Sequence, residues 1–212
     1  MKITKYVHSC LLVEMPAPVN RTALFDPGIY STFDIDRLEY LDDIIITHEH
    51  FDHFDLELVK KLASKFPNAH ITAPDEVVNK LDAEGVSATS ATSEGIVFFN
   101  SPHEAIRPFR EADPPQEIGV HYLDKLSHPG DSHSFQETKT ILALPVQAPW
   151  GSTVNAVKVA IELKPKYVIP VHDWHWSDEA REAMYGALEG TFKEHGITFI
   201  KAISGEPFVL DA

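Results

Sequence analysis

The residues Thr47-His48-Glu49-His50-Phe51-Asp52-His53 place three imidazoles and one carboxylate in a single short stretch. They follow Asp43-Ile44-Ile45-Ile46, a β-branched run that predicts a buried strand. Alternate side chains of an extended chain point to the same side, so two of the histidines could serve one metal ion while the aspartate and the last histidine serve a second. Imidazole and carboxylate are the ligands expected for Zn²⁺, Mn²⁺ or Fe²⁺. We therefore interpret this stretch as a metal loop rather than as a polar loop with unrelated histidines.

Length and composition are those of an ordinary globular protein. The 212 residues fit one domain covering 1–212, and 43% hydrophobic with 24% charged residues is typical of such domains. No apolar run approaches the roughly 20 residues of a membrane span, and Met1 to Val7 is too polar for a signal-peptide core. The lone Cys10 suits a reducing compartment and is more typical of a small buried residue than of a catalytic thiol. We therefore expect a cytoplasmic protein without a membrane partner.

The net charge indicates which kinds of binding partner to expect. Lysine plus arginine number 18 and aspartate plus glutamate 32, which gives a net charge of −14. Such a surface repels phosphate backbones, so we expect a small-molecule substrate and no nucleic acid. A small anionic substrate stays open, because divalent cations can dominate the field inside a pocket. The sequence leaves homo-oligomer formation open.

The pattern of strands and helices predicts the fold class. Short strand patterns dominate the first half, and strand–helix units occur in both halves. One strand is expected over 119–126. A helix is expected to begin at Ser177 and to present one apolar face, made of Ala180, Ala183, Met184, Ala187, Leu188 and Phe192. The chain should therefore form two sheets with helices outside them.

The run His48-x-His50-x-Asp52-His53 resembles the signature of the metallo-β-lactamase superfamily. Companion motifs follow in family order over essentially the whole chain: Asp26-Pro27-Gly28, Gly130-Asp131-Ser132 and Ile169-Pro170-Val171-His172. The resemblance implies the metallo-β-lactamase fold, an α/β, four-layer αββα sandwich of two mixed β-sheets flanked by helices.

The resemblance also implies a ligand set. One metal ion would take His48, His50 and a third histidine, and the other would take Asp52, His53 and His172, with Asp131 bridging both. We place His103 third, because it follows a predicted strand at the expected point in family order. His121 and His128 are its rivals, and both are expected on strands that flank the turn before Asp131. The implied cofactor is two divalent metal ions, zinc first, with manganese or iron as alternatives.

A second group of residues could support the site. Asp26 could orient a ligand histidine or only form its turn. His8 could hold a ligand in place, lie at the edge of the pocket or be a buried structural histidine. His133 could bind substrate or donate a proton. Trp174 and His175 follow His172 and could line the substrate mouth, although aromatic residues in such loops more often pack.

The implied function is that of a metal-dependent hydrolase of a small metabolite. Two metal ions roughly 3.5–4 Å apart can share a water molecule and lower its pKa towards neutrality. Asp52 and Asp131 are the expected catalytic carboxylates, and Asp52 could accept a proton and return it to the leaving group. The bond cut would be an ester, lactone, amide or phosphoester.

Within the superfamily, the chain most resembles the branch that includes L-ascorbate-6-phosphate lactonase. The opening Tyr6-Val7-His8-Ser9-Cys10-Leu11-Leu12 and the segment Lys164 to His172 carry this likeness, although Val7 stands where that branch usually has glycine.

The sequence also bears on three other functions. A redox enzyme related to the diiron flavoproteins is disfavoured, because these usually have glutamate where this chain has His50. A phosphodiesterase or nuclease of the same superfamily is disfavoured by the net charge. A non-catalytic metal- and ligand-binding protein remains the main alternative.

Overall fold

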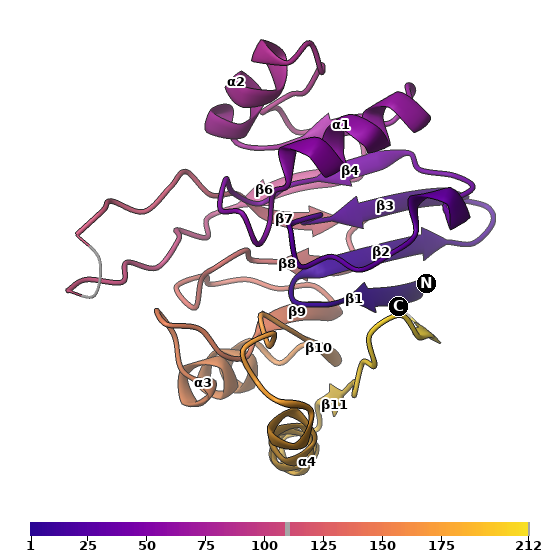
Figure 1. The fold of residues 1–212 in the computed structure, drawn as a ribbon. Helices are drawn as coiled ribbons and strands as arrows, with labels where there is room; N and C mark the ends of the chain where they lie inside the picture. Colours follow the sequence, from indigo (N-terminus) through magenta and orange to yellow (C-terminus); the bar gives the residue numbers. More distant parts are fainter. Residues whose placement is uncertain (109–110, 212) are drawn as a thin grey trace. The chain divides into compact units, whose positions relative to one another are not determined.

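The computed structural model describes residues 1–108 and 111–211 and divides them into two compact units. The first unit comprises Met1–Thr92 and the segment from Ile203 onwards, and the second comprises Ser93–Ala202. Each unit holds one six-stranded sheet with parallel and antiparallel pairs, and α-helices pack against it (Figure 1). The predicted pair of mixed sheets with helices is thus confirmed, while the assignment of 1–212 to a single domain stays a prediction.

The first sheet runs in the order β12-β1-β2-β3-β4-β5. Its antiparallel part pairs β12 with β1, β1 with β2 and β2 with β3, whereas β3, β4 and β5 are parallel. The strands span Pro207–Val209, Lys2–Tyr6, Cys10–Met15, Arg21–Phe25, Asp43–Ile45 and His70–Thr72 in that order. The carboxyl ends of β3 and β4 therefore share an edge, which brings the turn after β3 beside the metal loop after β4.

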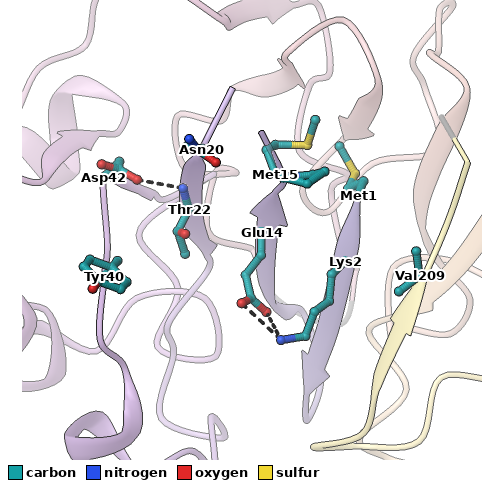
Figure 2. A pocket seen from close by; sticks show the side chains of 10 residues that line it. Met1, Lys2, Glu14, Met15, Asn20, Thr22, Tyr40, Asp42 and Val209 are labelled. Carbon is teal, nitrogen blue, oxygen red and sulfur yellow. Dashed lines mark hydrogen bonds and ion pairs between the residues drawn. The ribbon is translucent and has the colours of Figure 1, made fainter. Parts of the chain in front are cut away.

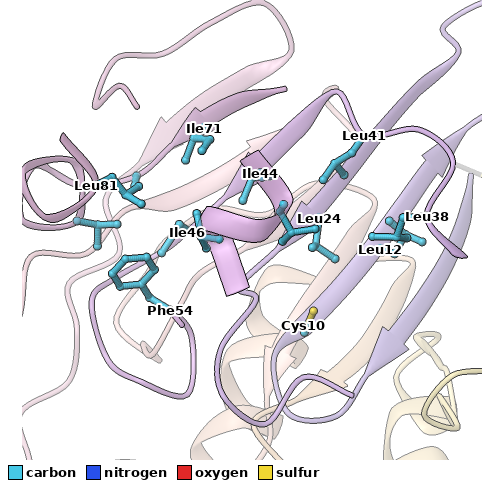
Figure 3. Packing of buried hydrophobic residues seen from close by; sticks show 14 residues of the cluster. Cys10, Leu12, Leu24, Leu38, Leu41, Ile44, Ile46, Phe54, Ile71 and Leu81 are labelled. Atoms are coloured by element: carbon cyan, nitrogen blue, oxygen red, sulfur yellow. The ribbon is translucent and has the colours of Figure 1, made fainter. Parts of the chain in front are cut away.

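Two helices cover one face of this sheet. Helix α1 (Leu56–Lys65) begins at Asp55, whose side chain accepts hydrogen bonds from the Glu57 and Leu58 amides. Helix α2 spans Asp75–Ala83. Their buried side chains pack with strand residues in one apolar cluster, which includes Val59, Leu62, Val77, Leu81, Leu24, Ile44 and Ile71 (Figure 3). This core anchors both ends of the metal loop, because β4 precedes the loop and α1 follows it.

The second sheet runs in the order β11-β10-β9-β8-β7-β6. Its strands span Thr198–Phe199, Tyr167–Val171, Ile141–Pro145, Leu126–His128, Gly119–Tyr122 and Ile96–Phe99 in that order. Helices α3 (Thr153–Leu163) and α4 (Asp178–Glu194) pack on it through Ala156, Ala160, Tyr185, Leu188 and Phe192. Among residues 1–108 and 111–211, no helix combines the length and apolarity needed to cross a bilayer.

One sequence prediction about the second unit is wrong, and another is right only for Leu188 and Phe192. The single strand over 119–126 is a hairpin of β7 and β8, because Leu123 and Asp124 adopt φ values of 49° and 55° that reverse the chain. On α4 the three alanines of the expected apolar face are exposed, and the buried residues are Tyr185, Leu188 and Phe192. The large side chains three and four residues apart form the stripe that meets the sheet, and they decide which face of the helix is buried.

Truncation of Leu62 should show how much packing in the first unit's core contributes to the free energy of unfolding. Leu62 is fully buried on α1, so Leu62→Ala should lower the free energy of unfolding by about 2–4 kcal/mol through lost burial and a cavity. Urea unfolding followed by circular dichroism measures this. The exposed neighbour is the control, and Lys61→Ala should change stability by less than about 0.5 kcal/mol. Equal effects of the two substitutions would contradict the packing described.

Candidate metal centre

The metal loop between β4 and α1 is a tight turn. The amides of His53 and Phe54 both donate to the His50 carbonyl, at 2.9 and 2.8 Å. The chain from His50 to Phe54 is therefore a turn and not extended. The turn folds the loop back on itself, so that the His48 ring lies 4.8 Å from the His50 ring and 4.1 Å from the His53 ring, centroid to centroid.

The turn sorts the side chains of the first unit into two groups of metal-ligand atoms. One group contains His48 and His50, and the other contains His8, Asp52 and His53; within each group the ligand atoms lie within 4.8 Å of one another. In the second group, His8 Nε2 lies 3.0 Å from Asp52 Oδ2. The loop thus pairs its residues as the two-metal interpretation expects and adds His8, which the sequence placed only in a supporting role. Two His/Asp groups of this kind are consistent with a dinuclear metal site.

Asp26 orients two of these histidines. Its Oδ2 accepts hydrogen bonds from His53 Nδ1 at 2.8 Å and from the Thr47 hydroxyl at 2.9 Å, and its Oδ1 accepts from the Thr47 amide at 2.8 Å. Because the Thr47 hydroxyl proton points to Asp26, the hydroxyl oxygen accepts from His48 Nδ1, 3.0 Å away. Both imidazoles therefore carry their proton on Nδ1, which makes Nε2 the basic nitrogen that a metal ion requires. Asp26 thus does more than form its turn.

Gly28 allows the turn after β3 to touch the metal loop. A Cβ atom on Gly28 would lie 2.0 Å from the Asp52 carbonyl oxygen and 2.5 Å from the His53 amide nitrogen. Only a residue without a side chain can approach the backbone of two predicted ligands this closely. The third residue of the Asp26-Pro27-Gly28 motif is therefore explained by this contact.

In the second unit Asp131 lies between two histidines. Its Oδ2 is 3.7 Å from His103 Nε2 and 3.2 Å from His172 Nε2. The same oxygen accepts a hydrogen bond from the Trp150 indole N–H at 3.0 Å. One carboxylate oxygen thus faces the Nε2 atoms of two histidines that the resemblance assigns to different metal ions, which is the geometry expected of a bridging ligand.

The two histidines around Asp131 are held in the same tautomer as those in the first unit. His103 Nδ1 donates to the Glu104 carbonyl at 2.8 Å, and His172 Nδ1 donates to the Gln147 carbonyl at 2.6 Å. A carbonyl oxygen only accepts, so the proton must lie on Nδ1 in both rings. Neutral imidazoles with basic Nε2 atoms beside a carboxylate fit Zn²⁺, Mn²⁺ or Fe²⁺.

The two alternative candidates for the third histidine, His121 and His128, contact other groups in the second unit. His121, on β7, contacts Ser127 Oγ through Nδ1 at 2.9 Å and Glu137 Oε2 through Nε2 at 3.2 Å. His128, on β8, accepts a hydrogen bond from the Gly130 amide through Nδ1. Both lie on strands, as expected. His103, by contrast, has its Nε2 atom 3.7 Å from Asp131 Oδ2.

The supporting residues of the second unit gather around Trp150 and His172. His133 Nε2 donates to the Pro145 carbonyl at 2.8 Å, its ring lies 5.1 Å from Trp150, and burial lowers its pKa, which favours the neutral form. The His175 ring lies 6.2 Å from His172 and 5.2 Å from the ring of Trp174, whose side chain is 43% exposed. Trp174 and His175 thus present surface next to a predicted ligand, and whether they or His133 contact substrate stays a prediction.

Several contributing residues carry no signal in the sequence. Glu117 Oε2 accepts from the Asp131 amide at 2.7 Å, and the Glu104 amide donates to the Asp131 carbonyl at 3.0 Å. Asp173 is buried and accepts hydrogen bonds from the Tyr185 hydroxyl and from Arg181, which ties the segment after His172 to α4. These partners are remote in the sequence or belong to common residue types, so spacing could not identify them.

Two other features lie outside this chemistry. Burial raises the pKa of Cys10 to about 12, so the thiol is neutral, as expected for a small core residue. A surface hollow of about 610 Å³ in the first unit is lined by Met1, Met15, Val209 and the Lys2–Glu14 ion pair, among others (Figure 2). None of the predicted ligands lines this hollow.

Comparison with known proteins bears on the fold and the family. The family described as "Beta-lactamase superfamily domain" matches residues 2–172, a span that ends at the last predicted ligand. Protein Rv0786c of Mycobacterium tuberculosis is 30% identical over 201 residues, which cover 89% of this chain and 91% of that protein. A metallo hydrolase of the archaeon Ignicoccus hospitalis has a similar structure, with a TM-score of 0.72, 18% identity and 99% of both chains covered. The metallo-beta-lactamase fold protein YhfI of Bacillus subtilis gives a TM-score of 0.66, with 15% identity over 98% of both chains. The predicted fold class is therefore confirmed.

Adding one methyl group at Gly28 should disrupt the metal loop. Gly28→Ala forces the backbone of Asp52 and His53 to move, so it should destabilise the protein by about 2–3 kcal/mol and weaken metal binding. Thermal unfolding and metal titration measure the two effects. Gly190→Ala is the matched control, because no atom lies within 4 Å of its added Cβ on α4, and it should be neutral or stabilising by up to about 1 kcal/mol. A neutral Gly28→Ala variant would contradict the close approach.

Removing the indole N–H at position 150 should weaken metal binding. Trp150→Phe keeps an aromatic ring against His172 and His133 but deletes the hydrogen bond to Asp131 Oδ2. Loss of such a partner typically raises the metal dissociation constant about 10–100-fold. Competition with a chromophoric chelator measures this constant. Trp176→Phe, which alters a tryptophan packed in the second core, should leave it unchanged; equal constants for all three proteins would refute the role of the indole.

Proposed function

Because the chain belongs to the beta-lactamase superfamily, we propose that it is a metal-dependent hydrolase that cuts an ester, lactone, amide or phosphoester bond in a small metabolite. The observation that carries the proposal is the position of Asp131 Oδ2, which faces the Nε2 atoms of His103 and His172. A carboxylate placed between two imidazoles of fixed tautomer is suited to bridging two metal ions.

The proposed ligand set is the one that the family resemblance implies. His48, His50 and His103 would hold one divalent metal ion, and Asp52, His53 and His172 the other, with Asp131 shared. Zn²⁺ is the first choice, and Mn²⁺ or Fe²⁺ are alternatives. The fixed Nδ1 protons of His48, His53, His103 and His172 support this assignment, because each leaves Nε2 as the donor atom.

The chain's own groups would position the reactants and move the proton. When bound, two divalent ions supply Lewis acidity towards the substrate and lower the pKa of water. The water oxygen would add to the carbonyl or phosphoryl centre, and the bond to the leaving group would break. Asp52 would take the proton from water and return it to the leaving group. His8 Nε2, 3.0 Å from Asp52 Oδ2, would hold that carboxylate in place during the transfer.

Lactones and esters are the first substrates to test. The resemblance to the ascorbate-6-phosphate lactonase branch supports them, and its two segments bear on the site. The opening segment supplies His8, which contacts Asp52, and the segment from Lys164 to His172 forms β10 and ends at the proposed ligand. The net charge of −14 supports a small-molecule substrate over a nucleic acid.

Metal-dependent turnover tests the proposal. Purified protein of known metal content should hydrolyse at least one member of an ester, lactone and phosphodiester panel, and a chelator should abolish this activity. His48→Ala and Asp131→Ala should reduce turnover to the level of metal-free protein, whereas His70→Ala, an exposed histidine on β5, should not. Full activity in both ligand variants would refute the assignment. Tight binding of a metabolite without turnover would favour the non-catalytic alternative.

A further inference from the structure

Two exposed apolar side chains lie on the loops that carry the metal ligands. Ile29 follows the Asp26-Pro27-Gly28 turn, and Phe51 lies between His50 and Asp52; each side chain is 53% exposed. The Ile29 amide donates to the Phe51 carbonyl at 2.8 Å, so the two residues are held together by the backbone. Their positions are therefore set by the same contacts that set the metal loop.

Tyr30 connects these residues to the proposed ligands. Its ring lies 6.0 Å from Phe51 and 5.6 Å from His8, centroid to centroid, in edge-to-face geometry. His8 in turn contacts Asp52. We call Ile29, Tyr30 and Phe51 the apolar rim; its link to the proposed ligands is the contact of the Tyr30 ring with His8, which is buried beside Asp52.

The apolar rim has no role in the hydrophobic core. None of its three residues belongs to the apolar cluster under α1 and α2 or packs against it. Exposed apolar surface next to a polar site is typical of ligand binding, and covering it would recover roughly 25 cal/mol per Å². The rim is thus suited to an apolar group of a substrate whose reactive bond lies at the metal ions.

The charges around the proposed ligands disfavour a phosphorylated substrate. No lysine or arginine occurs in the segments that carry the proposed ligands and their neighbours, which are 26–32, 47–55, 101–106, 128–137, 146–153 and 171–177. Two cations reach these segments from elsewhere in the chain, and both are paired: Lys80 Nζ lies 2.6 Å from Glu49 Oε2, and Arg181 Nε lies 3.3 Å from Asp173 Oδ2. A phosphate group on the substrate would find no lysine or arginine on these segments to pair with.

We propose that the substrate is an uncharged lactone or ester that bears an alkyl or aryl substituent, and that this substituent binds to the apolar rim. This inference rests on the proposed hydrolytic function and narrows its substrate class. It favours apolar acyl compounds over sugar phosphates.

A homologous series of lactones tests the inference. For the metal-loaded protein, kcat/KM should rise by about tenfold or more from γ-butyrolactone through γ-hexalactone to γ-octalactone, because each buried methylene adds binding. Ile29→Ser and Phe51→Ser should each lower kcat/KM for γ-octalactone about tenfold more than for γ-butyrolactone. The controls Ile203→Ser and Tyr40→Ser remove exposed apolar side chains at 61% and 74% exposure and should leave the slope of the series unchanged.

A binding measurement separates this inference from the proposed reaction. Octanoate should bind the metal-loaded protein at least about tenfold more tightly than butanoate in calorimetric titration, and Phe51→Ser should remove the difference. The inference would be overturned if kcat/KM did not rise along the lactone series, or if the control variants lost as much kcat/KM for γ-octalactone as the rim variants do. Either result would leave the proposed hydrolysis intact. If no ester or lactone is cut, the proposed function fails, and equal affinities for octanoate and butanoate would then overturn the rim as well.

Discussion

The buried carboxylate of Asp26 is the interaction on which the first unit's site depends. A fully buried charge is costly unless it is satisfied by hydrogen bonds, and Asp26 receives three, from the Thr47 amide, the Thr47 hydroxyl and His53 Nδ1. These bonds join the turn after β3 to the loop after β4. They also fix the tautomers of His53 and, through Thr47, of His48. One side chain therefore sets both the path of the loop and the chemistry of its nitrogen atoms.

In the second unit, backbone carbonyls and a glutamate orient the proposed ligands. Carbonyls of Glu104 and Gln147 orient His103 and His172, and Glu117 holds the amide of Asp131. Backbone strain occurs at site residues of both units: His8 and Asp26 in the first and His172 in the second adopt positive φ, at 63°, 45° and 61°. Such conformations cost roughly 1–3 kcal/mol each and persist where surrounding contacts over-determine them. The strain thus coincides with the residues that the proposed chemistry needs.

The sequence predicted where helices and strands occur better than it predicted which of their sides are buried. The strand before the metal loop follows from its β-branched run, and the start of α4 follows from the capping residue Ser177; both signals are local. The apolar face of α4 was predicted only in part. Leu188 and Phe192 are buried as expected, but the alanines are exposed, because alanine fits either side of a helix, and the buried Tyr185 was missed. The hairpin between β7 and β8 was missed, because neither leucine nor aspartate at 123 and 124 indicates a left-handed conformation as clearly as glycine would.

For the site, the sequence by itself determined the donor types, their order along the chain and the family to which they belong, since these are fixed by residue identity and spacing. Only the tertiary structure decided which histidine lies beside Asp131, that Gly28 is needed for contact with the metal loop, and that a backbone hydrogen bond holds Ile29 beside Phe51. Each of these depends on residues far apart in the chain meeting at the edge of a sheet. Contacts of that kind follow from strand order and loop conformation, which no local pattern encodes.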